Sequence, residues 1–268
     1  MKTAHGPVAM FDSGLGGLTV LSALRALVPS VDVVYLADTA HVPYGDRTLE
    51  DIAQLAAGNI KRLQEYDPAI ILIACGSSCS AFDARGWPDT QVPLVGLVEH
   101  GARAAVAASR SGRIGVIATQ ATAKSGVFGR AIRRLRPDAM PVELGAPALV
   151  PIVEAGDSST ERAAIAVAQA CEPIKAGVCD ALILGCTHFP HLSAWFAQAL
   201  GPQVALVDPA QACARECAEM LEGAPPGQGR LIVEVTGDTH SFARHAAALG
   251  APAITQLVSY AGLRSGPK

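Results

Sequence analysis

The sequence predicts an α/β fold of two pseudo-symmetric domains, each with a mainly parallel sheet flanked by helices. Short aliphatic runs alternate with helical stretches, the pattern restarts near mid-chain, and two runs end in a cysteine, at Cys75 and Cys186. Runs of Ile, Leu, Val and Ala are typical of strands buried on both faces of a parallel sheet. Because α/β proteins bind ligands at the carboxyl ends of such strands, we expect two half-sites that face each other across an interdomain cleft.

The composition predicts a large aliphatic core. The chain has 268 residues, of which 50% are hydrophobic, 17% charged and 4% aromatic. This length is enough for one large or two small α/β domains. With a formal net charge of −3 and a pI near 6.2, the chain offers no basic patch. We therefore expect neither nucleic acid nor an anionic membrane as a partner.

The amino-terminal residues and the cysteines favour a cytoplasmic location. No basic segment followed by a long apolar stretch opens the chain, so we expect no signal peptide. No apolar run approaches the length of a membrane span. Seven cysteines, an odd number, in a chain without a secretion signal indicate reduced thiols.

The first half of the chain alternates between predicted strands and helices. We expect strands at 8–11, 32–37, 69–74 and 93–98, and helices at about 18–27, at 48–66 and directly after the third strand. Pro29 ends the first helix, and the segment from Thr48 to Asp51 is typical of a capping box that opens the second.

The second half repeats this pattern. We expect strands at 113–117, 141–144, 181–184 and 203–207, a helix start within 118–125, a loop at 150–154 and a helix at 160–175. A further helix at 209–223, a strand at 231–236 and a helix at 241–249 follow.

The repeat indicates an internal duplication, although two aliphatic α/β halves can also resemble each other by chance. The Val-Pro pairs at 42–43 and 150–151 and the two strand-end cysteines recur at nearly the same spacing. The simplest packing returns the last residues to the first half. We therefore predict a discontinuous first domain, residues 1–98 with 208–268, and a second domain, residues 99–207.

The turn from Asp12 to Gly17 follows a strand and opens a helix. Its backbone N–H groups are suited to a carboxylate or phosphate. It matches neither G-x-G-x-x-G nor a Walker A sequence, so a nucleotide site is weakly supported. A tight turn that lets the helix pack on the strand is the alternative.

The cysteines at the strand ends allow several chemistries. The paired Cys-x-x-Cys spacing of a zinc or redox site is missing. Two thiols at equivalent points suit the removal of a proton from one face of a substrate and its return to the other, which inverts a carbon centre. Asp12 and His188 are candidate proton partners. The alternative is that Cys75 and Cys186 are inert buried thiols.

Small polar side chains surround both strand ends. They are Ser13, Ser77, Ser78, Thr119, Thr122 and Thr187. With helix N-termini they suit the carboxylates of a small acid, although each hydroxyl is also a candidate helix N-cap. Tyr44 and Glu154 lie on the equivalent Val-Pro loops. There they are candidates to contact a substrate amine or to form the walls of the cleft.

Four motifs resemble the glutamate racemase family, part of the cofactor-independent aspartate/glutamate racemase superfamily. They are Phe11-Asp-Ser-Gly-Leu-Gly-Gly17, Ala37-Asp-Thr-Ala-His-Val-Pro-Tyr-Gly45, Leu184-Gly-Cys-Thr-His-Phe-Pro190 and Thr236-Gly-Asp238, and the likeness runs essentially from end to end. The resemblance implies a pseudo-twofold pair of domains and interconversion of L- and D-glutamate for peptidoglycan synthesis. It implies a small amino-acid partner, no metal and no other cofactor, and a possible homodimer.

The resemblance also implies site residues. The implied catalytic residues are Cys75, Cys186, Asp12, His188 and Glu154. The implied substrate-binding residues are Asp12, Ser13, Pro43, Tyr44, Gly45, Gly76, Ser77, Thr119, Thr122, Thr187 and His188. By resemblance, Cys75 serves the D-enantiomer and Cys186 the L-enantiomer.

This chain departs from the family pattern beside Cys75. The family usually has Asn-Thr where this sequence has Gly76-Ser77, and usually has Gly where it has Ala121. Two alternatives therefore stay open: a racemase or isomerase acting on another substrate such as aspartate, or a non-catalytic homologue that binds a ligand or a protein. A pyridoxal-phosphate enzyme is disfavoured, because Lys124 is better suited to a helix start than to a cofactor.

Overall fold

The computed structural model describes residues 6–261 and contains two sheets in which every strand pair is parallel. The first sheet has the strand order β10-β9-β2-β1-β3-β4 and the second β6-β5-β7-β8. The strands of the first sheet are β1 (Val8–Asp12), β2 (Val33–Ala37), β3 (Ile70–Ile73), β4 (Leu94–Gly96), β9 (Leu231–Val235) and β10 (Gln256–Ser259). Those of the second are β5 (Arg113–Ala118), β6 (Met140–Gly145), β7 (Ala181–Leu184) and β8 (Ala205–Val207). The predicted α/β class is confirmed.

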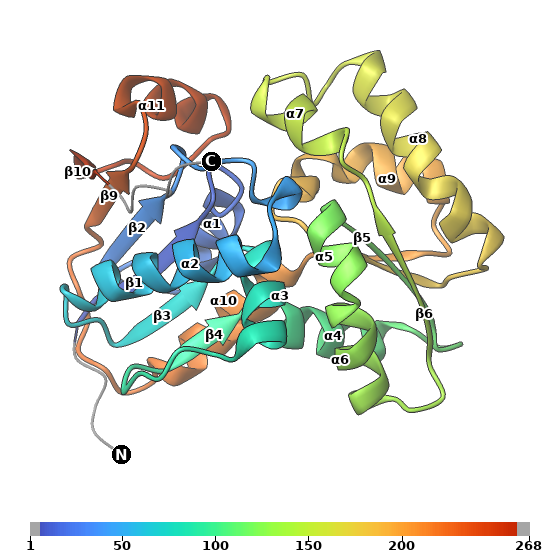
Figure 1. Ribbon diagram of the computed structural model, residues 1–268, viewed down its shortest axis with the longest axis horizontal. Helices are drawn as coiled ribbons and strands as arrows, with labels where there is room; N and C mark the ends of the chain where they lie inside the picture. The colour runs from blue at the N-terminus through green and yellow to red at the C-terminus, as the bar shows by residue number, and fades with distance from the viewer. Residues whose placement is uncertain (1–5, 262–268) are drawn as a thin grey trace.

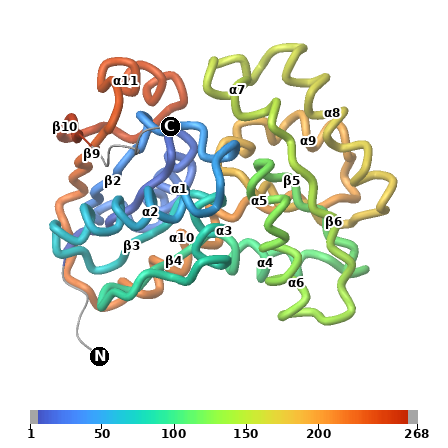
Figure 2. Tube along the Cα trace, in the orientation of Figure 1, coloured from blue at the N-terminus to red at the C-terminus, as the bar shows by residue number. Residues whose placement is uncertain are grey.

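Helices flank both sheets, and the two halves lie side by side (Figures 1 and 2). The half of the structure built on the first sheet, called the first half from here on, contains α1 (Leu18–Leu27), the 3-10 turn η1 (Tyr44–Asp46), α2 (Leu49–Gln64), α3 (Gly76–Arg85), α4 (Leu97–Ala108), α10 (Pro209–Met220) and α11 (Thr239–Ala248). The second contains α5 (Gln120–Ser125), α6 (Val127–Leu135), α7 (Leu149–Glu154), α8 (Glu161–Ala176), η2 (Phe189–Leu192) and α9 (Ser193–Leu200). Helix α4 packs on α10 and also on α6, so it joins the two halves.

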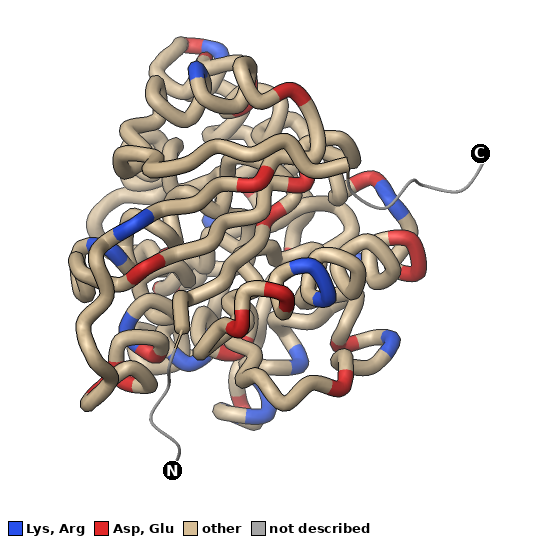
Figure 3. The backbone as a smooth tube through the Cα atoms, turned by 90° about the vertical axis from the view of Figure 1, so that its left-hand side faces the viewer, with Lys and Arg blue, Asp and Glu red and all other residues tan. Residues whose placement is uncertain are grey.

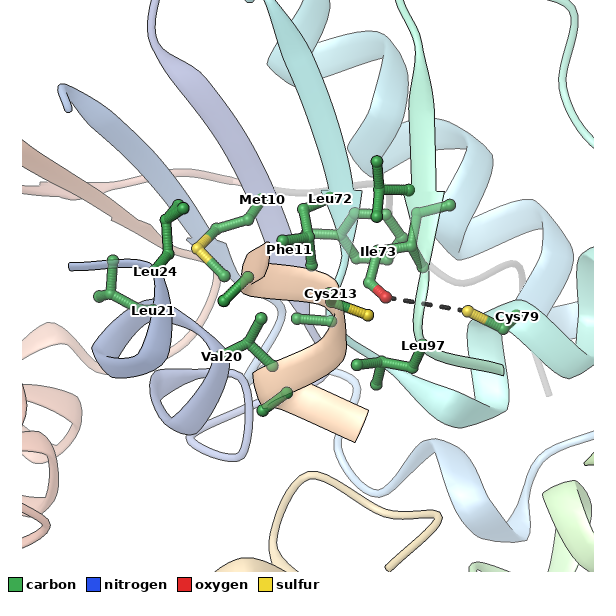
Figure 4. Close-up of a cluster of buried hydrophobic side chains, with 14 of the residues drawn as sticks. Met10, Phe11, Val20, Leu21, Leu24, Leu72, Ile73, Cys79, Leu97 and Cys213 are labelled. Atoms are coloured by element: carbon green, nitrogen blue, oxygen red, sulfur yellow. Dashed lines mark hydrogen bonds between the residues drawn. The ribbon is translucent and has the colours of Figure 1, made fainter. Parts of the chain in front are cut away.

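The main core is aliphatic and continues from one sheet to the other. Strand side chains such as Met10 and Leu72 pack against Val20 and Leu24 of α1, with Cys213 of α10 beside them (Figure 4). The same cluster extends to Phe128 of α6 and to one face of the second sheet. Alternate residues of strands point to opposite faces, which is why the other face of that sheet packs separately against α8 and α9.

The chain crosses from the first sheet to the second after β4 and returns after β8. These crossings lie close to the boundaries expected from the sequence. The division into residues 1–98 with 208–268 and 99–207 stays a prediction.

Several elements differ from the sequence-based expectation. Residues 150–154, expected as a loop, belong to α7, because Pro151 is tolerated in a first helical turn and Ile152 and Val153 are buried. The expected strand at 93–98 ends at Gly96, where α4 begins. The helix expected from 118–125 is broken at Gly126, which adopts a left-handed conformation.

No helix within residues 6–261 is long and apolar enough to cross a bilayer. On the side of the first sheet away from the second, Lys and Arg lie scattered among Asp and Glu (Figure 3).

Candidate active site

A pocket lies between the two halves, at the carboxyl ends of β1 and β3 on one side and of β5 and β7 on the other. Most residues implied by the sequence line it: Asp12, Ser13, Pro43, Tyr44, Gly45, Cys75, Gly76, Ser77, Thr119, Cys186, Thr187 and His188. Thr122 and Glu154 do not line it and contact residues that do. The two cysteines thus face one pocket from opposite halves.

Sequence reasoning missed several lining residues. They are Val42, Asp46, Gln120, Pro147, Val150, Pro151 and Gly185. The repeated Val-Pro pairs were a usable signal, since both pairs line the pocket. Gln120 and Gly185 carried no signal beyond their places next to Thr119 and Cys186.

Asp12 connects the two halves at the end of β1. Its Oδ1 accepts a hydrogen bond from the Gly14 N–H at 2.8 Å, and its Oδ2 accepts one from the Thr187 hydroxyl at 3.1 Å. Burial raises the pKa of the Asp12 carboxyl, and the charge of His188 opposes this rise. The turn after Asp12 is tight because Gly16 lies against Thr187 and His188, leaving no room for a Cβ atom.

His188 lies between a thiol and a carboxylate. Its Nδ1 is 3.7 Å from the sulfur of Cys186, and its Nε2 is 2.5 Å from Oε1 of Glu154. Burial lowers the pKa of His188, but the hydrogen bonds to Cys186 and Glu154 outweigh it, so the pKa lies well above its usual value. Burial likewise raises the pKa of Glu154, but the His188 hydrogen bond holds it below its usual value. The geometry therefore favours a charged His188–Glu154 pair.

Cys75 has a different environment. Burial, with a further contribution from the charge of Asp12, raises its pKa to about 12. Cys75 is therefore a protonated thiol at neutral pH, whereas the sulfur of Cys186 has the imidazole of His188 within reach. A protonated thiol on one side, and a sulfur beside the charged His188 imidazolium on the other, suit the donation and the acceptance of a proton, respectively.

Three hydroxyl groups form a connected cluster across the pocket. Ser77 Oγ lies 3.0 Å from Thr119 Oγ1, which lies 3.0 Å from Thr122 Oγ1. Thr119 also caps α5, because its hydroxyl accepts the Thr122 N–H. Thr122 is completely buried, and its hydroxyl lies within hydrogen-bond distance of the Ser77 and Thr119 hydroxyls.

Tyr44 lines the pocket, but its hydroxyl has partners elsewhere. It donates to Oδ2 of Asp38 at 2.5 Å and accepts from Nδ2 of Asn59 at 3.2 Å. Contact between a substrate amine and this hydroxyl would therefore compete with existing bonds. The position favours a role of Tyr44 in framing the pocket.

The lining residues within the described chain include no Lys or Arg. A substrate carboxylate would thus be held by hydroxyl groups, backbone N–H groups and helix N-termini. Within residues 6–261, no three His, Cys, Asp or Glu side chains are placed to hold a metal ion.

Comparisons with known proteins identify the family of this chain. The family profile "Asp/Glu/Hydantoin racemase" matches residues 19–217. A glutamate racemase from Desulforudis audaxviator is 45% identical over 213 residues, which cover 79% of this chain and 78% of the relative.

Solved structures show the same fold. Glutamate racemase isoform RacE1 from Bacillus anthracis has a TM-score of 0.90 at 29% identity, covering 94% of this chain and 97% of that one. Glutamate racemase from Thermus thermophilus, in complex with β-chloro-D-alanine, has a TM-score of 0.84 at 36% identity, covering 97% and 98%. This chain is an isomerase that belongs to the Asp/Glu/hydantoin racemase family.

Proposed function

We propose that this protein interconverts L- and D-glutamate by a two-base mechanism that needs no cofactor, with Cys75 and Cys186 as the bases. The observation that carries the proposal is the placement of these cysteines on opposite halves of one pocket. The proposal on the substrate is supported by relatives called glutamate racemase that align with most of this chain.

In the L-to-D direction, the Cys186 thiolate takes the α-proton and the Cys75 thiol donates a proton to the opposite face. The charged His188–Glu154 pair lies beside Cys186, with Nδ1 of the imidazole 3.7 Å from its sulfur. Cys75, with a pKa of about 12, starts as the protonated donor. After turnover the two protonation states are exchanged, which prepares the enzyme for the D-enantiomer.

We assign the binding of the substrate carboxylates to uncharged groups of the protein. Ser13, Ser77, Thr119 and Thr187 line the pocket with hydroxyls, and the N-terminus of α3 begins there at Gly76. Asp12, whose carboxylate is fixed by Gly14 and Thr187, is assigned to proton handling and to contact with the substrate ammonium group.

We further propose that the product D-glutamate is supplied to peptidoglycan synthesis in the cytoplasm. All seven cysteines are free and buried, in keeping with reduced thiols. The expectation of a homodimer stays a prediction.

The test is racemisation by purified protein without added pyridoxal phosphate. L-Glutamate, L-aspartate and a panel of other amino acids are each incubated with the protein, and the enantiomers are separated by chiral chromatography. We expect inversion of glutamate and its loss in a Cys75→Ala, Cys186→Ala double variant. Inversion of aspartate but not glutamate would refute glutamate as the substrate. Full activity in the double variant would refute the two-cysteine mechanism.

A further inference from the structure

A tyrosine hydroxyl lies buried against the turn that follows β1. Tyr35 is the middle residue of β2 and is completely buried. Its hydroxyl donates to the Gly14 carbonyl at 2.8 Å. A buried tyrosine hydroxyl usually finds such a partner, and here the partner belongs to the turn that begins at Asp12. Because Tyr35 does not line the pocket, any effect that it has on the site passes through this turn.

The turn is seated directly on this hydroxyl. A Cβ atom on Gly17 would lie 2.7 Å from the Tyr35 hydroxyl oxygen and 2.7 Å from Cβ of Asp12. Tyr35 therefore contacts the turn at two places, the Gly14 carbonyl and Gly17. The Tyr35 ring belongs to the main core, with its centroid 6.4 Å from that of Phe242 in α11. Because packed cores resist displacement, the position of the hydroxyl is fixed.

Two successive N–H groups of the turn serve the two carboxylates of the site. The Gly14 N–H donates to Oδ1 of Asp12 at 2.8 Å. The Leu15 N–H is a hydrogen-bond donor to Glu154 of the second half. Oε1 of Glu154 lies against the turn, since a Cβ atom on Gly14 would be only 3.2 Å from it. One turn of the first half thus holds a carboxylate from each half.

The peptide between Gly14 and Leu15 links these contacts to Tyr35. In a trans peptide the C=O and N–H groups point in opposite directions. A donor that holds the Gly14 carbonyl therefore also directs the Leu15 N–H, on the other side of the peptide, toward Glu154. Glycine has the widest choice of backbone conformations, so this peptide can rotate readily if nothing holds its carbonyl. The Tyr35 hydroxyl supplies that restraint.

We propose that Tyr35 is a positioning residue, whose hydroxyl fixes the Gly14–Leu15 peptide so that the turn holds the Asp12 and Glu154 carboxylates in place. This inference rests on the proposed racemisation, in which Asp12 contacts the substrate ammonium group and Glu154 acts through His188. Tyr35 neither gives nor takes a proton in the reaction. Its contribution is the orientation of two backbone donors.

Loss of the hydroxyl changes the ionisation of both carboxyl groups in the same direction. Burial raises the pKa of Asp12 and of Glu154, and the N–H groups of the turn, together with His188, oppose this rise. Without the restraint on the turn, the opposition weakens and both pKa values increase. The acid limb of the pH–kcat/KM profile, which reports groups of the free enzyme that must be ionised, then moves to higher pH.

Other titratable groups face these two carboxylates. They are His188, Cys75, His191 and His245. All four are kept when only the Tyr35 hydroxyl is removed, so a moved acid limb is assigned to that hydroxyl. A simple loss of folded enzyme lowers kcat/KM by the same factor at every pH and leaves the limb in place.

The experiment compares the pH–kcat/KM profiles of wild type, Tyr35→Phe and Tyr66→Phe with L-glutamate. Tyr66→Phe is the matched control, because it also loses a phenol hydroxyl that donates to a buried acceptor, Glu234, away from the pocket. In Tyr35→Phe we expect kcat/KM at the optimum to fall about 5-fold to 50-fold, as for a lost buried hydrogen bond. Its acid limb should lie about 0.5 to 1 pH unit higher, whereas Tyr66→Phe should keep the wild-type limb.

A further variant restores the donor. Replacement of Tyr35 by 4-aminophenylalanine keeps the ring and puts an N–H donor where the hydroxyl was. We expect its acid limb to return to that of wild type, because the Gly14 carbonyl again has a partner.

The inference is overturned, with the proposed function intact, if Tyr35→Phe keeps the wild-type acid limb or if Tyr66→Phe shares the shift. It is also overturned if 4-aminophenylalanine leaves the limb as in Tyr35→Phe, since the hydrogen bond is then not the cause. A Tyr35→Phe chain that does not fold by circular dichroism assigns the hydroxyl to folding instead of the site. Absence of glutamate inversion in the wild type at every pH is a different outcome, and it refutes the proposed function itself.

Discussion

Nε2 of His188 lies 2.5 Å from Oε1 of Glu154, while Nδ1 of the same ring lies 3.7 Å from the sulfur of Cys186. Glu154 comes from α7, which belongs to a segment expected to be a loop, and it reaches the cysteine only through the imidazole. This places Glu154 behind the pocket, where it acts on His188 rather than on substrate. Its contribution is therefore electrostatic, and it is measurable through the titration of His188.

Replacing Glu154 by Gln removes the charge that favours protonated His188. The folded-state pKa of His188 is raised, so its imidazolium is lost only as the pH rises through that value; without Glu154 the loss occurs at lower pH. We expect kcat to fall at least about tenfold, with the alkaline limb of the pH–kcat profile moved to lower pH. Glu161→Gln, on the exposed face of α8, is the control. An unchanged alkaline limb in Glu154→Gln would contradict this role.

Cys75 should ionise far above the range of an ordinary thiol. Burial and the Asp12 charge raise its pKa to about 12, so its thiolate is absent near pH 9, where an unperturbed thiol is mostly ionised. The measurement is thiolate absorbance at 240 nm, as the difference between wild type and Cys75→Ser. We expect no difference up to about pH 10. A step in the difference near pH 8 to 9 would contradict the assignment of Cys75 as the resting proton donor.

A buried ion pair joins α2 to β9 away from the pocket. Arg62 donates to both carboxylate oxygens of Glu234, which is completely buried, and Tyr66 also donates to it. Arg62→Ala leaves this charge uncompensated, so we expect a loss of about 3 to 5 kcal/mol in the free energy of unfolding by urea. An Arg62→Met, Glu234→Met double variant should recover most of it.

The control for this pair is Arg134→Ala, because both side chains of the Arg134–Glu99 pair are exposed to solvent. An exposed pair contributes about 0 to 1 kcal/mol. Equal losses in Arg62→Ala and Arg134→Ala would show that the Glu234 carboxylate finds another partner or solvent.

Val178, between α8 and β7, carries backbone strain. Its backbone φ is 51°, which is unfavourable for a β-branched residue. Because the side chain is 69% exposed, its burial offsets little of this cost. We expect Val178→Gly to stabilise the protein by about 1 kcal/mol in thermal unfolding. Asp67, at φ 46°, is the control, since Asp tolerates this conformation and Asp67→Gly should change little. A lower Tm for Val178→Gly would contradict the strain.

The strands and strand-end residues were predictable because buried aliphatic runs and their last residues form a local pattern. This pattern alone predicts both cysteines at one site. Edge strand β10 was missed because it is short and half exposed. The partners of Tyr44, the burial of Thr122 and the approach of Gly76 to Gly185 depend on how distant segments pack, and no local pattern carries that information.

The most direct test of two bases on opposite faces follows the wild-type protein with L-glutamate in D₂O at early times. Mass spectrometry measures α-deuterium separately in the D-glutamate formed and the L-glutamate that remains. The account predicts deuterium in the product and almost none in the remaining substrate, because Cys186 removes the proton and Cys75 supplies the deuteron. Deuterium appearing in both enantiomers at equal rates would indicate one base serving both faces, and would contradict the account.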